Sequence, residues 1–133
     1  MVKANIKKSF NCDRDKLWNT ITDNRNYDWR TDLDRIEILD DTHFIEYAKN
    51  NYPTSFTITN KEKLKVYEFD IENTNIKGKW IGKFKELADG SIEVDFTEEI
   101  ETNNFIMKLF AKTYLKNMQK RYIQDLEREL SKR

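Results

Sequence analysis

The stretch of sequence that decides the fold runs from Lys77 to Glu101 and reads KGKWIGKFKELADGSIEVDFTEEIE. Its middle, Ala88-Asp89-Gly90, is typical of a three-residue hairpin loop with the glycine in the left-handed conformation, so Leu87 pairs with Ser91. In this register one face carries four facing pairs of opposite charge, which are Lys85–Glu93, Lys83–Asp95, Lys79–Glu99 and Lys77–Glu101. Because a one-residue slip would turn the lysines inward, the pattern predicts an antiparallel hairpin in this register.

The other face of this hairpin is apolar apart from one carboxylate. It places Gly78, Trp80, Gly82 and Phe84 against Ile100, Glu98, Phe96 and Val94. The strand before it continues the inward row with Tyr67, Phe69 and Ile71, while Glu68 and Asp70 face outward, within reach of Lys79 and Lys77. The alternation therefore predicts a sheet with one aromatic face and one charged face.

Further strands are predicted from short runs bounded by turn residues. Between Leu33 and Thr102 the predicted strands are 34–40, 43–49, 54–60, 64–72, 75–87 and 91–102. Residues 2–10 add an opening strand, in which only Lys8 interrupts the apolar row. Because the connections are short, we expect an antiparallel meander.

Two helices complete the predicted elements. Asp13 can cap a short helix that ends near Asp23, with Leu17, Trp18 and Ile21 on its apolar side. Residues 104–132 contain no Gly or Pro and form a long helix of roughly 40 Å at 1.5 Å per residue. Its apolar row is Phe110, Tyr114, Met118, Tyr122, Leu126 and Leu130. Four-residue steps drift around a 3.6-residue helix, so different sides of this helix are apolar at its two ends.

Composition limits the function classes. A length of 133 residues suits a single domain, 1–133, and excludes a two-domain enzyme. The charges balance at 24 basic and 24 acidic residues, so no strong attraction to nucleic acid is expected. One Cys and one His exclude disulfide scaffolds and structural zinc, and we expect neither a metal nor a cofactor. No apolar run approaches ~20 residues, so we expect a cytoplasmic protein without membrane insertion or an export signal.

The order of these elements resembles the helix-grip fold of the START-like superfamily, also called SRPBCC. The features that carry the resemblance are the strand ending at Phe10, the helix with Leu17-Trp18, the loop with Trp29, the run Gly78-Lys79-Trp80-Ile81-Gly82 and the long terminal helix. The superfamily includes birch-pollen-allergen relatives, lipid-transfer domains and bacterial polyketide cyclase or dehydrase-like proteins. The turn Asp40-Asp41-Thr42 replaces the Gly-rich loop of the pollen-allergen branch, which argues against that branch and against phosphate contacts there. The resemblance is to the bacterial polyketide cyclase/dehydrase-like branch.

The resemblance implies an α+β fold in which a curved antiparallel sheet wraps around the C-terminal helix. It also implies a cavity between sheet and helix that usually holds a lipid, a polyketide or another apolar molecule. The predicted ligand-binding residues are Tyr67, Phe69, Trp80, Phe84, Phe96, Glu98, Phe110 and Tyr114. The alternative is that many of these rings fill a packed core. Gly78 and Gly82 either leave room for the ligand or allow the sheet to coil.

Glu98 is the most informative of these residues. A carboxylate on the inward face is expected to be neutralised or paired, so we predict that it titrates above an ordinary glutamate. It can orient a polar group of the ligand, and it is the one weak candidate for a general acid or base. The alternatives are a wet cavity, or pairing with Lys8 or with a tyrosine hydroxyl.

The remaining candidates carry weaker signals. His43 has no partner that spacing identifies, and we interpret it as a surface residue. Cys12 precedes a helix and can have a lowered thiol pKa, although an inert role is expected. Lys108, Lys112, Lys116 and Lys120 form a row on the long helix, where residues 104–133 hold eight basic and three acidic residues. This row is either a solvated face, which we favour, or a surface for phosphates or anionic lipid headgroups.

Three functions follow as hypotheses. The first is a carrier or sensor that binds a small, largely apolar ligand entering near the loops and the start of the long helix. The second is a polyketide cyclase or dehydratase-type enzyme that uses Glu98. The third is a protein-interaction module like the chaperone-activating relatives of the superfamily, with a closed interior. The ligand and the oligomeric state stay open at this point.

Overall fold

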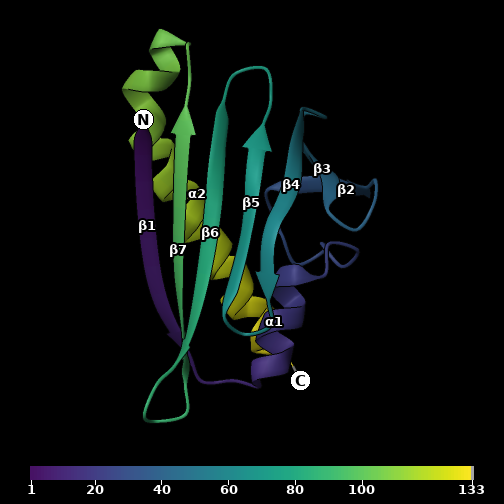
Figure 1. The fold of residues 1–133 in the computed structure, drawn as a ribbon, viewed down its shortest axis with the longest axis vertical. Coiled ribbons are helices and arrows are strands. Elements are labelled where there is room, and N and C mark those ends of the chain that lie inside the picture. The colour runs from purple at the N-terminus through teal and green to yellow at the C-terminus, as the bar shows by residue number, and fades with distance from the viewer. Residues whose placement is uncertain (133) are drawn as a thin grey trace.

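The computed structural model describes residues 1–132 as a single seven-stranded antiparallel sheet crossed by a long helix (Figure 1). The elements are β1 (Val2–Phe10), α1 (Arg14–Thr22), β2 (Leu33–Ile38), β3 (His43–Ala48), β4 (Pro53–Glu62), β5 (Val66–Glu72), β6 (Lys77–Glu86), β7 (Ile92–Glu101) and α2 (Phe105–Leu130). The strand order is β1-β7-β6-β5-β4-β3-β2, so the first strand pairs with the last and the others form a meander. This confirms the α+β helix-grip fold predicted from the sequence.

The β6–β7 hairpin has the predicted register. Leu87 N–H donates to the Ser91 carbonyl over 2.8 Å, and Gly90 has a φ of 86°. Lys77 faces Glu101 and Lys85 faces Glu93, with the other predicted pairs between them. The turn residues therefore fix which side chains reach the interior.

The facing charged side chains agree with the register of the hairpin but do not form ion pairs with each other. Among residues 1–132, none of the four predicted pairs lies within 4.0 Å, and the ion pairs formed on this face join different strands: Lys79–Asp70 over 3.9 Å and Lys3–Glu99 over 3.3 Å. Such exposed pairs contribute about 0–1 kcal/mol each. Their main effect is to disfavour wrong registers.

Both helices begin at capping side chains. The Asp13 carboxylate accepts a hydrogen bond from Lys16 N–H over 3.0 Å at the start of α1. The Asn104 side chain accepts hydrogen bonds from Ile106 and Met107 N–H at the start of α2. An Asn or Asp at this position satisfies backbone donors that the helix itself leaves free.

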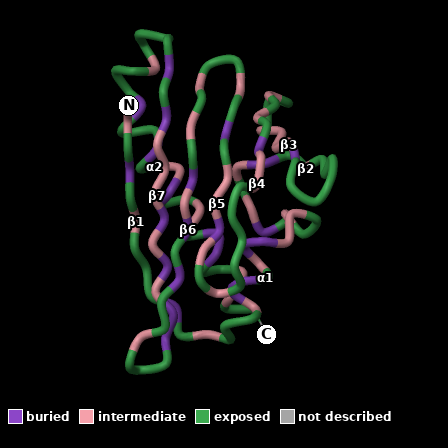
Figure 2. The backbone as a smooth tube through the Cα atoms, in the orientation of Figure 1, coloured by how far each residue is buried: buried purple, intermediate pink, exposed green. Residues whose placement is uncertain are grey.

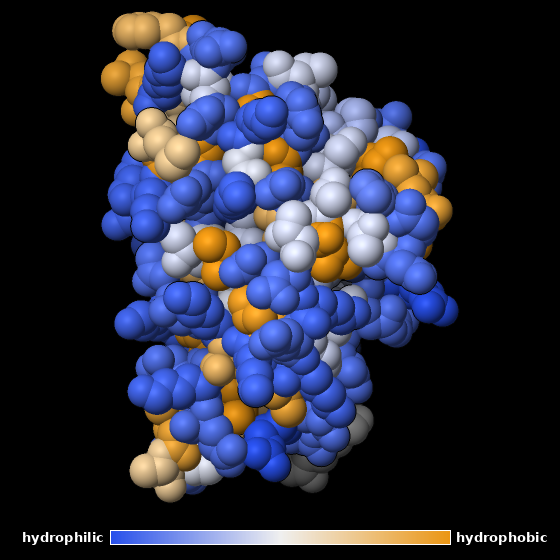
Figure 3. All heavy atoms as spheres, in the orientation of Figure 1, coloured by the Kyte–Doolittle hydropathy of each residue, from blue (hydrophilic) through white to orange (hydrophobic). Residues whose placement is uncertain are grey.

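The apolar row predicted for α2 is buried only towards the end of the helix: Leu126 is buried, whereas Phe110 and Tyr114 are exposed. Near its start the buried residues are Ala111 and Leu115, and towards its end they are Ile123 and Leu126. The first two turns extend to the edge of the sheet, where the tube is mostly exposed and apolar atoms gather on the surface (Figures 2 and 3). Four large apolar residues are exposed there: Phe105, Ile106, Leu109 and Phe110.

The core between sheet and helices is aromatic. Trp18 of α1 packs edge-on against Phe84 of β6, with ring centroids 5.1 Å apart, and Phe44 stacks on Phe56 at 4.9 Å. Large rings, each of which buries more area than an aliphatic side chain, thus supply a large part of this core.

Candidate functional site

A cavity of about 170 Å³ lies between the sheet and α2. Strands β3 to β7 contribute Phe44, Glu46, Thr54, Phe56, Tyr67, Phe69, Ile71, Trp80, Phe96 and Glu98 to its lining. Helix α2 contributes Tyr114, Leu115, Met118, Gln119 and Tyr122, and α1 with the loops adds Ile21, Asn24, Arg30, Asp32, Asn73 and Ile76. The cavity is the place where the aromatic face of the sheet is not filled by side chains of the helix.

One wall of the cavity is a set of aromatic rings in mutual contact. Phe69 and Trp80, on adjacent strands, stack with their centroids 4.9 Å apart and their planes 2° from parallel. Phe96 lies 4.8 Å from Trp80, and Tyr122 of α2 meets Phe96 edge-on at 5.6 Å. Because each ring is held by its neighbours, this wall presents fixed π surfaces to a bound molecule.

Glu98 places a carboxylate in this aromatic surrounding, opposite Trp80 in the strand register. Burial, reinforced by the negative charge of Glu46, raises its pKa from an ordinary 4.5 to about 7. No hydrogen bond or ion pair joins Glu98 to another side chain among residues 1–132; Lys8, one predicted partner, lies 3.9 Å from Glu127 instead. Glu98 can therefore bind a ligand group or exchange a proton near neutral pH.

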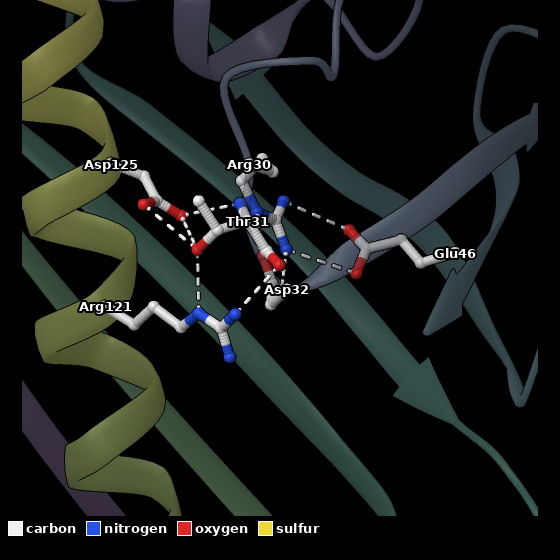
Figure 4. A network of polar contacts seen from close by, with 6 residues as sticks. All are labelled: Arg30, Thr31, Asp32, Glu46, Arg121 and Asp125. Carbon is white, nitrogen blue, oxygen red and sulfur yellow. Dashed lines mark hydrogen bonds and ion pairs between the residues drawn. The ribbon is translucent and has the colours of Figure 1, made fainter. Parts of the chain in front are cut away.

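The polar wall of the cavity centres on Arg30, whose side chain also lies over the Tyr122 ring, 5.0 Å from its centroid. The guanidinium donates to both Asp32 oxygens over 2.8 and 2.9 Å and reaches Glu46 over 3.4 Å (Figure 4). Burial opposes the arginine charge, but Glu46 and Asp32 outweigh it and raise the pKa of Arg30. Burial also raises the pKa of Glu46, which has the longer contact to Arg30. For Asp32, burial acts in the same direction, but the hydrogen bonds and charge of Arg30 outweigh it and lower the pKa.

The loop that carries Arg30 is fixed to α2. Asp125, 2% exposed, accepts hydrogen bonds from Thr31 N–H over 2.8 Å and from the Thr31 hydroxyl over 2.9 Å. Arg121 donates to the Thr31 hydroxyl and carbonyl from the next turn of the helix (Figure 4). This network holds the polar wall at a set position relative to the aromatic wall.

The structure brings six of the eight predicted site residues together. Those that line the cavity are Tyr67, Phe69, Trp80, Phe96, Glu98 and Tyr114. Phe84 and Phe110 lie outside its lining: Phe84 packs against Trp18 in the core, and Phe110 is 59% exposed on α2. Phe110 misses the cavity because the four-residue row turns away from the sheet toward the start of the helix.

Gly78 and Gly82 allow close packing and leave no space for a ligand. A Cβ at Gly78 would clash with the Glu99 carbonyl oxygen, and one at Gly82 would lie 2.7 Å from the Trp80 ring. Neither glycine lines the cavity. The prediction that these glycines leave room for the ligand is therefore wrong, and their absent side chains instead allow close contacts within the sheet.

The structure also shows the surroundings of the three weaker candidates, which are His43, Cys12 and the lysine row on α2. His43 is exposed and its Nδ1 lies 2.8 Å from Asp40, as a surface residue would. Burial, followed by the charge of Asp13, raises the pKa of the Cys12 thiol, so the lowered pKa suggested by the helix start is wrong. Lys108, Lys112, Lys116 and Lys120 are all exposed.

The sequence reasoning missed the polar wall. Glu46 follows Phe44 at the same parity on β3, which is the signal that identified Glu98, and it was open to detection in the same way. Arg30 and Asp32 lie in a loop, where no periodicity shows which side chains turn inward. Among residues 1–132, no cluster of His, Cys, Asp and Glu suited to a metal ion is present, and no helix has the length and apolarity needed to cross a membrane.

The chain has a START-like fold, as comparison with solved structures shows. It overlays a START superfamily protein from Mycobacterium smegmatis with a TM-score of 0.83 at 9% identity, covering 96% of each chain. A conserved protein from Geobacillus kaustophilus gives 0.84 at 9% identity, covering 98% of this chain and 95% of that one.

Residues 4–121 match the family model of DUF3284, a domain of unknown function. The chain belongs to that family. A third similar structure is DynU16, a putative protein in the dynemicin biosynthetic locus, with a TM-score of 0.72 at 10% identity, covering 96% of this chain and 48% of that one. A search of curated proteins gives no match.

Proposed function

We propose that the protein binds a small, largely apolar molecule in the cavity between the sheet and α2. The observation that carries the proposal is an interior space lined by stacked rings and by a few fixed polar groups. Apolar walls with a few oriented polar groups are typical of small-molecule sites. The START-like fold supports the same reading.

The volume of the cavity limits the size of the ligand. A volume of about 170 Å³ is comparable to a protein cavity of about 150 Å³ that accepts benzene. We therefore expect a molecule, or the enclosed part of one, of about one ring with a short substituent. A whole lipid chain or a multi-ring polyketide would require the cavity to widen.

We propose that the ligand enters the cavity near the start of α2. Tyr114 lines the cavity and is also 51% exposed, so its ring lies at the boundary between interior and solvent. Thr54 and Asn73 also line the cavity, at the start of β4 and just after β5. Asn73 donates to the Thr54 hydroxyl over 3.1 Å. These residues form the rim that a ligand would pass.

Filling the cavity tests this function. Leu115→Phe enlarges a lining residue of α2, whereas Leu130→Phe makes the same change at the other end of the helix, outside the lining. We expect a copurified small molecule in native mass spectra of the unaltered protein and of Leu130→Phe, and its loss from Leu115→Phe. Circular dichroism checks that both variants fold. Equal occupancy in both variants would place the molecule elsewhere.

A second candidate is catalysis by Glu98, favoured by its carboxyl group with a pKa of about 7 inside an aromatic cavity. Such a group can act as a general acid or base on a polyketide-like substrate. If so, Glu98→Gln retains binding of that substrate and loses turnover. A variant that turns over substrate at the original rate would leave binding alone as the function.

An interaction protein with a closed interior is the least supported reading. It requires a fully packed space between sheet and helix, whereas a cavity lies there.

A further inference from the structure

The charged groups that line the cavity are unbalanced. They comprise three carboxylates, Asp32, Glu46 and Glu98, and one cation, Arg30. The Lys and Arg side chains of α2 do not line the cavity. An enclosed site with more carboxylates than cations favours a ligand of positive charge.

Arg30 already interacts with two of these carboxylates, Asp32 and Glu46. Its Nε and Nη2 bind Asp32 in a bidentate pair, and Nη1 and Nη2 both lie 3.4 Å from Glu46. An anionic ligand would have to displace one of these contacts, and it would then meet Glu98. The cavity is therefore poorly suited to a carboxylate or phosphate.

Glu98 is the carboxylate left for the ligand. Among residues 1–132, every side-chain nitrogen or oxygen that is fully shielded from solvent has a hydrogen-bond partner. Glu98 forms no hydrogen bond or ion pair with another side chain, so its oxygens are not among these shielded atoms. Its oxygens are therefore reachable from the cavity, where a neutral apolar ligand would remove their water without replacing it.

The surroundings of Glu98 suit an organic cation better than a metal ion. Trp80 is its neighbour across the strand pair, and Trp80, Phe69 and Tyr114 all line the cavity. Aromatic faces attract ammonium groups, most strongly where water is excluded. Hard metal cations instead need six or more oxygen ligands, which one carboxylate among rings does not supply.

We propose that the cavity selects a small aromatic or cyclic amine, whose ammonium group pairs with Glu98 while its ring packs against Trp80 and Phe69. This inference rests on the proposed binding function and names the ligand class. The raised pKa of Glu98, caused by burial and by Glu46, agrees with a site whose counter-charge is supplied by the ligand.

The test uses three probes of nearly equal size that differ in charge: 2-phenylethylamine, 2-phenylethanol and phenylacetate. Affinities are measured at pH 7.5 by NMR titration of the ¹⁵N-labelled protein. We expect the amine to bind at least about tenfold tighter than the alcohol, the scale of one charge-assisted hydrogen bond, and phenylacetate to bind weakest. Chemical shift changes should centre on Trp80 and Tyr114.

Two matched variants assign the preference to Glu98. In Glu98→Gln we expect the amine to lose roughly tenfold in affinity while the alcohol changes by less than about twofold. Glu99→Gln makes the same change one residue further along β7, on the outer face beside Lys3, and should leave all three affinities unchanged. A similar loss in both variants would overturn the role of Glu98.

The pH dependence adds an independent readout. Amine binding should tighten as the pH rises through about 7, where Glu98 ionises, and Glu98→Gln should abolish that dependence. The charged or titratable groups that face Glu98 are Glu46, Asp32, Arg30 and Tyr114, and all of them remain in the variant.

The outcomes separate this inference from the proposed function. If the alcohol or phenylacetate binds as tightly as the amine, the amine preference is wrong and binding in the cavity stands. If none of the three probes binds at millimolar concentration while the protein is folded, the proposal of a one-ring ligand fails together with the inference.

Discussion

At the scale of single residues, Glu98 links the cavity to the stability of the fold. A carboxyl group whose pKa is about 7 in the folded protein and near 4.5 in the unfolded chain binds more protons when folded between these values. Its contribution to stability is fully present below pH 4.5 and is lost as the pH rises through 7. The protein thus retains an ionisable group in its interior at a cost in the free energy of unfolding, and this cost depends on pH.

The first prediction measures that cost. Relative to Glu98→Gln, the unaltered protein should lose stability between pH 4.5 and 7, by up to about 1.4 kcal/mol per pH unit. Urea unfolding of both proteins at pH 4.5, 6 and 7.5 checks this. A constant difference at all three values would mean that Glu98 titrates as an ordinary exposed glutamate.

The second prediction concerns Asp125, which fixes the Arg30 loop to α2. Asp125→Ala leaves Thr31 N–H without its acceptor, so we expect a loss of about 2–3 kcal/mol in the free energy of unfolding. Glu127→Ala removes an exposed carboxylate two residues away and should change stability by less than about 0.5 kcal/mol. Denaturant midpoints give both values; similar losses would show that the buried contact contributes little.

At the scale of elements, regular alternation was predictable and loop geometry was not. The β6–β7 register followed from turn residues and charge pairs, because a strand has only two faces and a slip reverses both. Glu98 was found by the same rule. Arg30 and Asp32 reach the cavity from a loop whose path depends on the distant contact between Thr31 and Asp125, and no local pattern encodes that contact.

The third prediction separates two phenylalanines that the sequence pattern treated alike. Phe84→Ala should cost about 3–5 kcal/mol, because Phe84 is 8% exposed and packs on Trp18. Phe110→Ala should change stability by less than about 0.5 kcal/mol, because that ring is mostly exposed. Thermal or urea unfolding compares them, and a large loss in Phe110→Ala would show that α2 starts in a different orientation.

At the scale of the whole molecule, the fold could be predicted from element order, whereas the cavity size could not. The seven strands and two helices of residues 1–132, in this order, leave few antiparallel arrangements. The space enclosed depends on how far each ring reaches, and the predicted ligand residues included Phe84, which fills the core, and Phe110, which faces solvent. Volume is a property of three-dimensional packing that periodicity does not report.

The fourth prediction contrasts the two ends of α2. Its first two turns are mostly exposed, while Leu115, Ile123 and Leu126 are 5% exposed or less. We expect amides of residues 109–112 to exchange with deuterium by local unwinding, and those of residues 119–126 to exchange only on global unfolding. NMR-detected exchange checks this; uniform protection along α2 would contradict it.

The lightly packed start of α2 has a kinetic consequence. Tyr114 follows those turns directly and stands at the rim of the cavity. Each transient unwinding of the helix start would release that ring and widen the entrance, while the sheet and the Thr31 loop stay closed. The rate at which a ligand enters would then be limited by fraying of one helix end, and substitutions that strengthen those turns should slow association without altering the walls that hold the ligand.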